Sequence, residues 1–362
     1  MHFDLFFELP MPPALARSEP QAVADWLDEI ALADRLGFHC AWLVEHHFMR
    51  GYSHAAKPEI LLAAAAMKSE KIRLGLGVIP APFHHPVHVA ERVATLDLVS
   101  GGRLEVGLGR GFSPLEHAVF DTAMADSTAA TEETLRVLRE SFARRPVCYR
   151  DAELDLVPQP LQQPHPPLWS AAITPSRFDW AAQQGLGVLA GPFKPWFMTR
   201  GDIARYREHW AHAAPPRIGM TLGIVCLPDG KRARALATPA FEWFYKELFR
   251  VTLPVLEKLY PGYEHYRELG RFRHLMSLGV NMGLLQTFGM AVAGTPQECI
   301  DALAGYREAG LTHCLLAIGA GALPPEVTRE SMQCIAEEVM PHFLPAPASG
   351  GEGAPVSRSG KP

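Results

Sequence analysis

Short apolar segments alternate with helical segments along most of the 362-residue chain. The apolar segments lack the polar–apolar alternation of a half-exposed strand, so each is expected to be buried on both faces. Such strands require a parallel sheet that helices cover. About eight units of this kind predict an α/β protein with a (β/α)8 TIM barrel, and a doubly wound open sheet is the alternative. The predicted strands are residues 2–9, 40–47, 71–80, 103–109, 166–173, 186–191, 217–228 and 312–319.

Residues 231–290 are longer than one strand–helix unit and carry several helical patterns, which predicts a helical insertion before the last strand. This insertion either holds substrate-binding residues or a lid, or it only adds helical packing. We assign residues 1–344 to one barrel domain. Residues 345–362 are rich in proline, glycine and serine and are predicted to form a disordered tail.

Charge and composition exclude several classes of function. The net charge is −5 and acidic and basic residues are well mixed, so nucleic-acid binding and a basic membrane-binding patch are not expected. No apolar stretch reaches the roughly 18 residues that a transmembrane helix requires. The six cysteines are scattered without a C-x-x-C pair, which favours reduced thiols in the cytoplasm over disulfides or structural zinc.

The segment "WLVEHHF" ends the second predicted strand in one acid and two histidines, Glu45, His46 and His47. Active-site residues of TIM barrels lie at the carboxyl ends of strands. If the strand continues through both histidines, only one of them faces the barrel mouth, because neighbouring strand residues point to opposite faces. A metal site is therefore disfavoured, and we expect none. A histidine suits proton transfer at neutral pH, although a purely structural strand end is the alternative.

Two further motifs have the residue types of a phosphate site. In "EVGLGRGF", Arg110 lies among glycines that permit close approach of a ligand, and arginine suits phosphate binding. In "AAITPSRFDW", hydroxyl groups and an arginine begin a helix, where backbone amides are free to bind an anion. The alternatives are a glycine-rich turn with a surface arginine and an ordinary helix cap. His84, His85 and His88 are interpreted as loop and helix-start residues rather than metal ligands.

Taken together, these motifs resemble the bacterial luciferase-like monooxygenases, which are flavin-dependent (β/α)8 barrels. The resemblance rests on "GFHCAWLVEHHF", "HHPVHVAERVATLDLVSGGRLEVGLGRGF", "DWAAQQGLG", "VAGTPQECIDAL" and "EVMPHF", which occur in the family's order. It covers roughly residues 1–345.

The resemblance implies that FMN binds in the barrel mouth. His46 would then lie near the reacting flavin as a base or hydrogen-bond partner, and Glu45 would contact the isoalloxazine region. A non-proline cis peptide below the ring would fall at Gly77–Val78. The FMN phosphate would be bound by Arg110, with further contacts from Thr174, Ser176 and Arg177.

The resemblance also implies a reaction. Reduced FMN, supplied as a co-substrate by a separate flavin reductase, would react with O2 through a flavin hydroperoxide and oxygenate a small apolar organic substrate. Members of the family commonly form homodimers. Gly109 and Ile173 replace a reactive cysteine and an acidic residue of true luciferases, which argues against light emission. The alternatives are an oxidoreductase that uses the deazaflavin coenzyme and a non-catalytic flavin-binding protein.

Overall fold

The computed structural model, which describes residues 1–259 and 279–344, contains a closed barrel of parallel strands. Each barrel strand pairs with its neighbours in the direction of the chain, and the pairing of β8 with β9 closes the sheet. The prediction of a (β/α)8 barrel is confirmed, and the open sheet is wrong. The barrel strands are β1 (His2–Phe7), β2 (Cys40–Leu43), β3 (Arg73–Pro80), β4 (Leu104–Gly109), β7 (Leu168–Ala172), β8 (Gly187–Ala190), β9 (Ile218–Cys226) and β11 (His313–Ala317).

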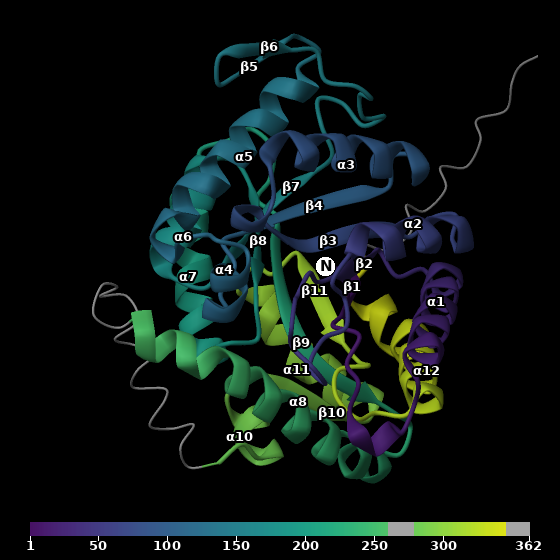
Figure 1. Ribbon diagram of the computed structural model, residues 1–362. Coiled ribbons are helices and arrows are strands. Elements are labelled where there is room, and N and C mark those ends of the chain that lie inside the picture. Colours follow the sequence, from purple (N-terminus) through teal and green to yellow (C-terminus); the bar gives the residue numbers. More distant parts are fainter. Residues whose placement is uncertain (260–278, 345–362) are drawn as a thin grey trace, which may run out of the picture.

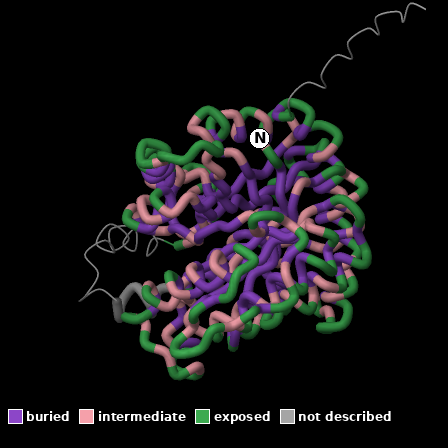
Figure 2. Tube along the Cα trace, turned by 90° about the horizontal axis from the view of Figure 1, so that it is seen from above, coloured by how far each residue is buried: buried purple, intermediate pink, exposed green. Residues whose placement is uncertain are grey.

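Helices surround the strands on the outside of the barrel (Figure 1). The first of them begins at a capping box between Ser18 and Gln21 and ends at Gly37, whose positive φ of 81° suits glycine. Figure 2 shows the result, with buried residues gathered inside and exposed residues on the outer loops and helix faces. The helices are α1 (Glu19–Leu36), α2 (Pro58–Lys68), α3 (Pro86–Val99), α4 (Pro114–Val119), α5 (Ser127–Phe142), α6 (Pro175–Gln183), α7 (Trp196–Glu208), α8 (Gly230–Leu259), α10 (Met282–Thr287), α11 (Pro296–Glu308) and α12 (Pro325–Cys334).

One local prediction needs correction, and two structural features had not been predicted. The strand predicted over residues 40–47 ends at Leu43. A strand–helix unit, β10 (Ala291–Gly294) followed by α11, had not been predicted, because its short Ala- and Gly-containing strand carries little β signal. This strand pairs with the carboxyl-terminal half of β9. A small antiparallel hairpin, β5 (Val147–Tyr149) and β6 (Ala152–Leu154), lies beyond α5 in Figure 1 and had not been predicted either.

Two indole rings fill the barrel interior. Trp42 and Trp169 are fully buried and meet edge to face, with ring centroids 5.4 Å apart. Space for them exists because neighbouring strands carry glycine: a Cβ at Gly75 would lie 2.3 Å from Trp42, and one at Gly187 would lie 2.3 Å from Trp169. The two indoles therefore form a plug between the two ends of the barrel.

Buried carboxylates below this plug are fully paired at the amino-terminal end of the barrel. Asp4 accepts hydrogen bonds from His39 Nδ1 at 3.0 Å and from the Trp42 indole at 2.8 Å. Glu105 accepts from Arg73 Nε at 2.5 Å and from the Trp169 indole at 2.6 Å. Each carboxylate thus satisfies one of the two indoles that fill the barrel.

The predicted insertion is only partly described. Its described part includes α8 and α10, and residues 260–278 lie outside the described residues, as does the predicted tail 345–362. Within α8, Phe244 stacks on Tyr52 with centroids 5.7 Å apart, and the Tyr245 hydroxyl donates to Met290 O at 2.7 Å. These two aromatic residues pack in the core. In the described part of the chain, no helix combines the length and apolarity needed to cross a membrane.

Candidate functional site

A cavity of about 170 Å³ opens at the barrel mouth, where the carboxyl ends of the strands meet. The sequence-predicted residues come together here from four separate segments of the chain. Thr174 is part of the cavity wall and Ser176 is not. The two hydroxyl groups lie 3.2 Å apart. The predicted residues in the wall are Glu45, His46, Gly77, Val78, Arg110, Thr174 and Arg177.

His46 faces a buried carboxyl group that had not been predicted from the sequence. Its Nε2 lies 3.7 Å from Glu8 Oε2. The other carboxyl oxygen, Oε1, accepts a hydrogen bond from the Tyr52 hydroxyl at 2.8 Å. The His46 ring also meets Phe112 edge to face, with centroids 5.2 Å apart. Glu8 Oε2 is buried without a hydrogen-bond partner among the described residues.

Burial sets the protonation of this pair. It raises the pKa of Glu8 from 4.5 to about 8, against the opposing effect of the Tyr52 hydrogen bond. Burial also lowers the pKa of His46 from 6.5 to about 4. At neutral pH the glutamic acid therefore carries its proton and the imidazole is neutral. The pair holds one acidic proton at the wall of the cavity.

A second polar cluster is built around Glu45. Its Oε1 accepts from His47 Nε2 at 3.0 Å and from His84 Nε2 at 2.5 Å. Burial alone would raise the pKa of Glu45, but these two histidines lower it to about 2. Glu116 completes the cluster by accepting the backbone N–H of His47 at 2.7 Å. Burial raises the pKa of Glu116 to about 7.

The two adjacent histidines do point to different places, as predicted, but not for the predicted reason. Strand alternation cannot explain it, because the strand ends at Leu43. The backbone N–H of His46 donates to Ala55 O at 3.1 Å. His47 is turned towards Glu45, and its ring packs against Phe120 with centroids 4.9 Å apart. The loop after β2 thus orients both rings.

Two arginines converge on the other side of the cavity. Arg110 Nη1 donates to the Thr128 hydroxyl at 3.1 Å, and Arg177 Nε donates to the Ser170 hydroxyl at 3.2 Å. The Arg177 guanidinium lies 3.6 Å from the centre of the Trp180 ring, and its Nη2 is buried without a partner among the described residues. Burial, together with repulsion from Arg110, lowers the pKa of Arg177 to about 9.

This convergence has the properties of an anion site. In the described part of the chain, neither arginine forms an ion pair with a carboxylate. Both line the cavity beside Thr174, the residue that precedes the first turn of α6. The Thr174 hydroxyl and two guanidinium groups together favour a phosphate. The two predicted phosphate motifs therefore meet in space.

The floor between these two sides is formed by the end of β3. The peptide bond Gly77–Val78 is cis. Val78 explains one departure from true luciferases, because a Cβ at Gly109 would lie 2.4 Å from Val78 Cγ2. A cysteine cannot occupy position 109 without displacing Val78. The rest of the wall is mainly apolar, with Phe6, Val44, Phe112, Met124, Ile173, Leu189 and Phe193.

The residues missed by sequence reasoning differ in how they could have been found. Glu8 ends an apolar strand, "HFDLFFEL", and this is the same signal that singled out Glu45. His84 had been noticed as a loop residue, but its contact with Glu45 spans two loops. Glu116 lies in the short helix α4 and has no motif around it.

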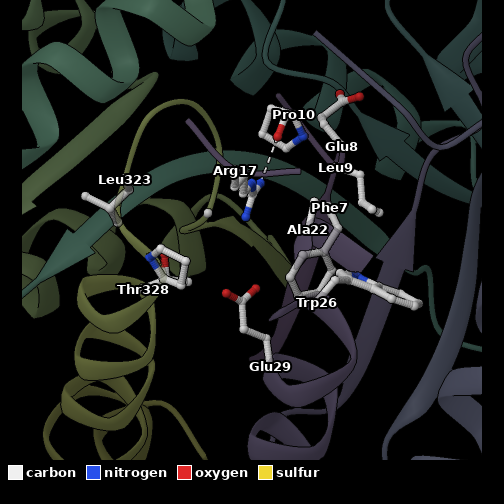
Figure 3. Close-up of a pocket in the computed structure, with 12 residues that line it drawn as sticks. Phe7, Glu8, Leu9, Pro10, Arg17, Ala22, Trp26, Glu29, Leu323 and Thr328 are labelled. Carbon is white, nitrogen blue, oxygen red and sulfur yellow. Dashed lines mark hydrogen bonds between the residues drawn. The ribbon is translucent and has the colours of Figure 1, made fainter. Parts of the chain in front are cut away.

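A second cavity lies between β1, α1 and α12 (Figure 3). Glu29 points into it, and burial raises the pKa of Glu29 to about 8. Glu8 belongs to its wall, but the Glu8 carboxyl group is turned away from Glu29 (Figure 3). Its volume of about 20 Å³ is enough for a water molecule but not for an organic ligand. The barrel mouth is therefore the candidate site.

Comparisons with known proteins agree with this geometry. Residues 1–313 match the profile of the family described as luciferase-like monooxygenase. The oxygenase component of a flavin-dependent trigonelline monooxygenase from Acinetobacter baylyi is 31% identical over 199 residues. That match covers 53% of this chain and 54% of the relative, so the chain spans about half the length of this relative.

Solved structures give a similar result. Monooxygenase RslO1 from Streptomyces bottropensis is 28% identical and superposes with a TM-score of 0.80, covering 95% of this chain and 100% of that one. The oxygenating constituent of 3,6-diketocamphane monooxygenase from Pseudomonas putida, in complex with FMN, has a TM-score of 0.74 at 18% identity, covering 95% and 99%. The coenzyme F420-dependent tetrahydromethanopterin reductase from Methanopyrus kandleri has a TM-score of 0.65 at 18% identity, with coverage of 95% and 99%. The last two show the fold alone.

Proposed function

Because the chain belongs to the luciferase-like monooxygenase family, we propose that it is the oxygenase component of a two-component, FMN-dependent monooxygenase. The observation that carries this proposal is the pair Arg110 and Arg177, which converge on the mouth cavity without an ion-pair partner in the described part of the chain. A phosphate-bearing cofactor satisfies both guanidinium groups. The neutral His46–Glu8 pair lines the same cavity.

The residues fit FMN as follows. The buried, unpartnered Nη2 of Arg177 marks where an anionic group is missing. Arg110, Arg177, Thr174 and Ser176 would hold the phosphate. Glu45, Gly77 and Val78 would contact the isoalloxazine ring. Bound reduced FMN supplies two electrons for the reduction of O2, with one oxygen atom going to the substrate and the other leaving as water.

The His46–Glu8 pair would manage the proton for this reaction. Glu8 holds a proton up to a pH of about 8, because burial raises its pKa to that value. The His46 imidazole is neutral because burial lowers its pKa to about 4, and its Nε2 lies 3.7 Å from the Glu8 carboxyl group. The apolar wall around the pair excludes water and so strengthens its effect on a bound ligand. We assign the catalytic role to His46.

Further features of the proposal concern partners and location. The apolar wall favours a small apolar organic substrate. A separate flavin reductase would supply reduced FMN, in keeping with the oxygenase component named for the trigonelline relative. We place the enzyme in the cytoplasm because its six cysteines are free thiols. We also propose a homodimer.

A cofactor titration under anaerobic conditions tests the proposal. Reduced FMN, oxidised FMN and reduced coenzyme F420 are each titrated into the full chain, and we expect the tightest binding for reduced FMN. A preference for coenzyme F420 would assign the protein to the deazaflavin-dependent oxidoreductases instead. Binding of FMN without substrate-dependent O2 consumption, in a screen of apolar compounds with an added flavin reductase, would favour a non-catalytic flavin protein.

Substitution His46→Ala tests the catalytic assignment. General acid–base residues typically contribute about 10²- to 10⁴-fold to turnover, so we expect a loss in this range. FMN affinity should change little, because the phosphate is assigned to Arg110, Arg177, Thr174 and Ser176 and not to His46. His342→Ala, an exposed histidine after α12, is the control and should leave turnover unchanged. Wild-type turnover in His46→Ala would remove His46 from the mechanism.

A further inference from the structure

Three histidines gather at the amino-terminal end of the barrel, on the opposite side of the indole plug from the candidate site. They are His2 on β1, His39 immediately before β2, and His313 on β11. Their nearest ring nitrogens all lie within 4.8 Å of one another. In the described ranges 1–259 and 279–344, no other group of three His, Cys, Asp or Glu side chains is arranged to hold an ion.

The barrel register brings two of them together. His2 and His313 are direct partners in the parallel pairing of β1 with β11, and their rings stack with centroids 4.8 Å apart. His39 joins them because its backbone N–H donates to Phe3 O at 2.8 Å. Its ring centroid lies 4.2 Å from that of His2. The cluster thus joins the first barrel strand, the last barrel strand and the entry to the second.

The hydrogen bonds of His39 and His313 determine which nitrogen remains available. His39 Nδ1 donates to the buried carboxylate of Asp4 at 3.0 Å. The Thr312 hydroxyl lies 3.1 Å from Ile218 O and 2.8 Å from His313 Nδ1. In His39 the proton on Nδ1 leaves the lone pair on Nε2, and in His313 the lone pair is on Nε2 when Nδ1 donates to the Thr312 hydroxyl. No hydrogen bond among the described residues uses either Nε2 atom.

This pattern is the one found around metal-binding histidines. A metal-ligating histidine donates its second ring nitrogen to a carboxylate or another acceptor, which fixes the tautomer and the ring orientation. Asp4 does this for His39, and the Thr312 hydroxyl, 2.8 Å from His313 Nδ1, is placed to do it for His313. His2 is exposed and makes no side-chain hydrogen bond to a described residue, so its ring can rotate to complete a site.

We propose that His2, His39 and His313 bind a divalent transition-metal ion of the Zn²⁺ type at the amino-terminal end of the barrel. His39 and His313 bind through Nε2, and water occupies the remaining position. Imidazole ligands suit zinc, copper and nickel. Nitrogens bound to zinc at about 2.0–2.1 Å lie roughly 3.3 Å apart, so the rings need to close by about 1.5 Å or less. The ion would fasten the first barrel strand to the last.

This proposal departs from the expectation of no metal drawn from the sequence, and it does not depend on the flavin chemistry. The ion would lie below the indole plug, away from His46 and Arg110. We therefore expect it to affect folding and not turnover. The competing explanation is a stack of neutral imidazole rings that binds nothing.

Zinc titration of the metal-stripped full chain distinguishes the two explanations. With a chromophoric chelator as competitor, we expect one Zn²⁺ per chain, and a rise in Tm when Zn²⁺ is in excess. Loss of one outer-shell partner already weakens metal sites by about 10- to 100-fold, so His2→Ala and His39→Gln should weaken zinc binding by at least tenfold. Co²⁺ bound in a four-coordinate site should show intense visible absorption that both variants lose.

Two control variants test adventitious binding. Cys148→Ser removes an exposed thiol, and His88→Ala removes an imidazole whose side chain is 73% exposed. Both should bind zinc as the wild type does. No zinc binding at about 100 μM, or equal affinity in wild type, His2→Ala and His39→Gln, would overturn the proposal. His2→Ala is the safest variant, because the His2 side chain is exposed and its loss leaves no buried group unpaired.

Discussion

Both ends of the barrel bury ionisable side chains, but these differ in how many hydrogen-bond partners they have. At the amino-terminal end, Asp4 and Glu105 each have two hydrogen-bond donors, including one indole each. At the mouth, Glu8 Oε2 and Arg177 Nη2 are buried without partners among the described residues. Buried polar groups are normally satisfied within the fold, so an unsatisfied one at a cavity wall indicates that a ligand completes it. The paired carboxylates at one end stabilise the barrel, whereas the unpaired atoms at the other end face the mouth cavity.

The largest expected effect is a loss of unfolding free energy when a buried carboxylate at the amino-terminal end is removed. Glu105→Ala leaves the Trp169 indole and Arg73 Nε without their acceptor, and breaking a buried pair in this way costs about 3–5 kcal/mol. Urea unfolding should show this loss of unfolding free energy. The exposed Glu153→Ala on β6 should show almost none. A loss below about 1 kcal/mol for Glu105→Ala would mean that this end is not the stabilising one.

A smaller effect is expected on cofactor affinity at the mouth. Arg110→Ala should weaken FMN binding by about 10- to 100-fold, because a hydrogen bond to a charged group contributes about 1.5–3 kcal/mol. Arg217 is the matched control. It is also partly buried and lies over the Trp169 ring, but at the amino-terminal end. FMN is titrated into Arg110→Ala and Arg217→Ala. An equal loss of FMN affinity in both variants would contradict the assignment of the phosphate site to the mouth.

The sequence alone was enough to predict the barrel and part of the candidate site. Apolar runs with helices between them dictate the fold, and the strand-end rule locates Glu45 and His46. The same rule applied to "FFEL" would have located Glu8. The sequence does not reveal the protonation states of Glu8 and His46. The pKa values of Glu8 and His46 depend on burial by segments distant along the chain.

Contacts between distant loops were beyond prediction for a related reason. Glu45 and His84 are joined through two loops, and neither loop has a spacing that indicates the other. The histidine cluster is a stronger case, since positions 2, 39 and 313 form no motif at all. Only the register of β1 against β11 places His2 beside His313. Local patterns predict elements, whereas register and loop packing decide which polar groups meet.

A third prediction tests whether Glu8 is held protonated at the mouth. Because burial raises its pKa from 4.5 to about 8, the folded state keeps a proton that the unfolded state releases between these values. Stability therefore falls as pH rises from 4.5 to 8, by on the order of 1 kcal/mol per pH unit at most. Glu8→Gln stays neutral and still accepts the Tyr52 hydrogen bond, so it should lose the contribution of Glu8 to this pH dependence and keep that of Glu29.

Comparison with Glu29→Gln distinguishes an effect of the Glu8 proton on stability from an effect on catalysis. Its pKa is also raised from 4.5 to about 8 by burial, but it faces the small second cavity and not the mouth. Glu29→Gln should flatten the pH dependence of stability as Glu8→Gln does. Turnover should fall above pH 8 in the wild type and in Glu29→Gln, where Glu8 loses its proton, and this alkaline limb should be absent in Glu8→Gln. Matching pH–turnover profiles in the two variants would show that the Glu8 proton has no part in catalysis.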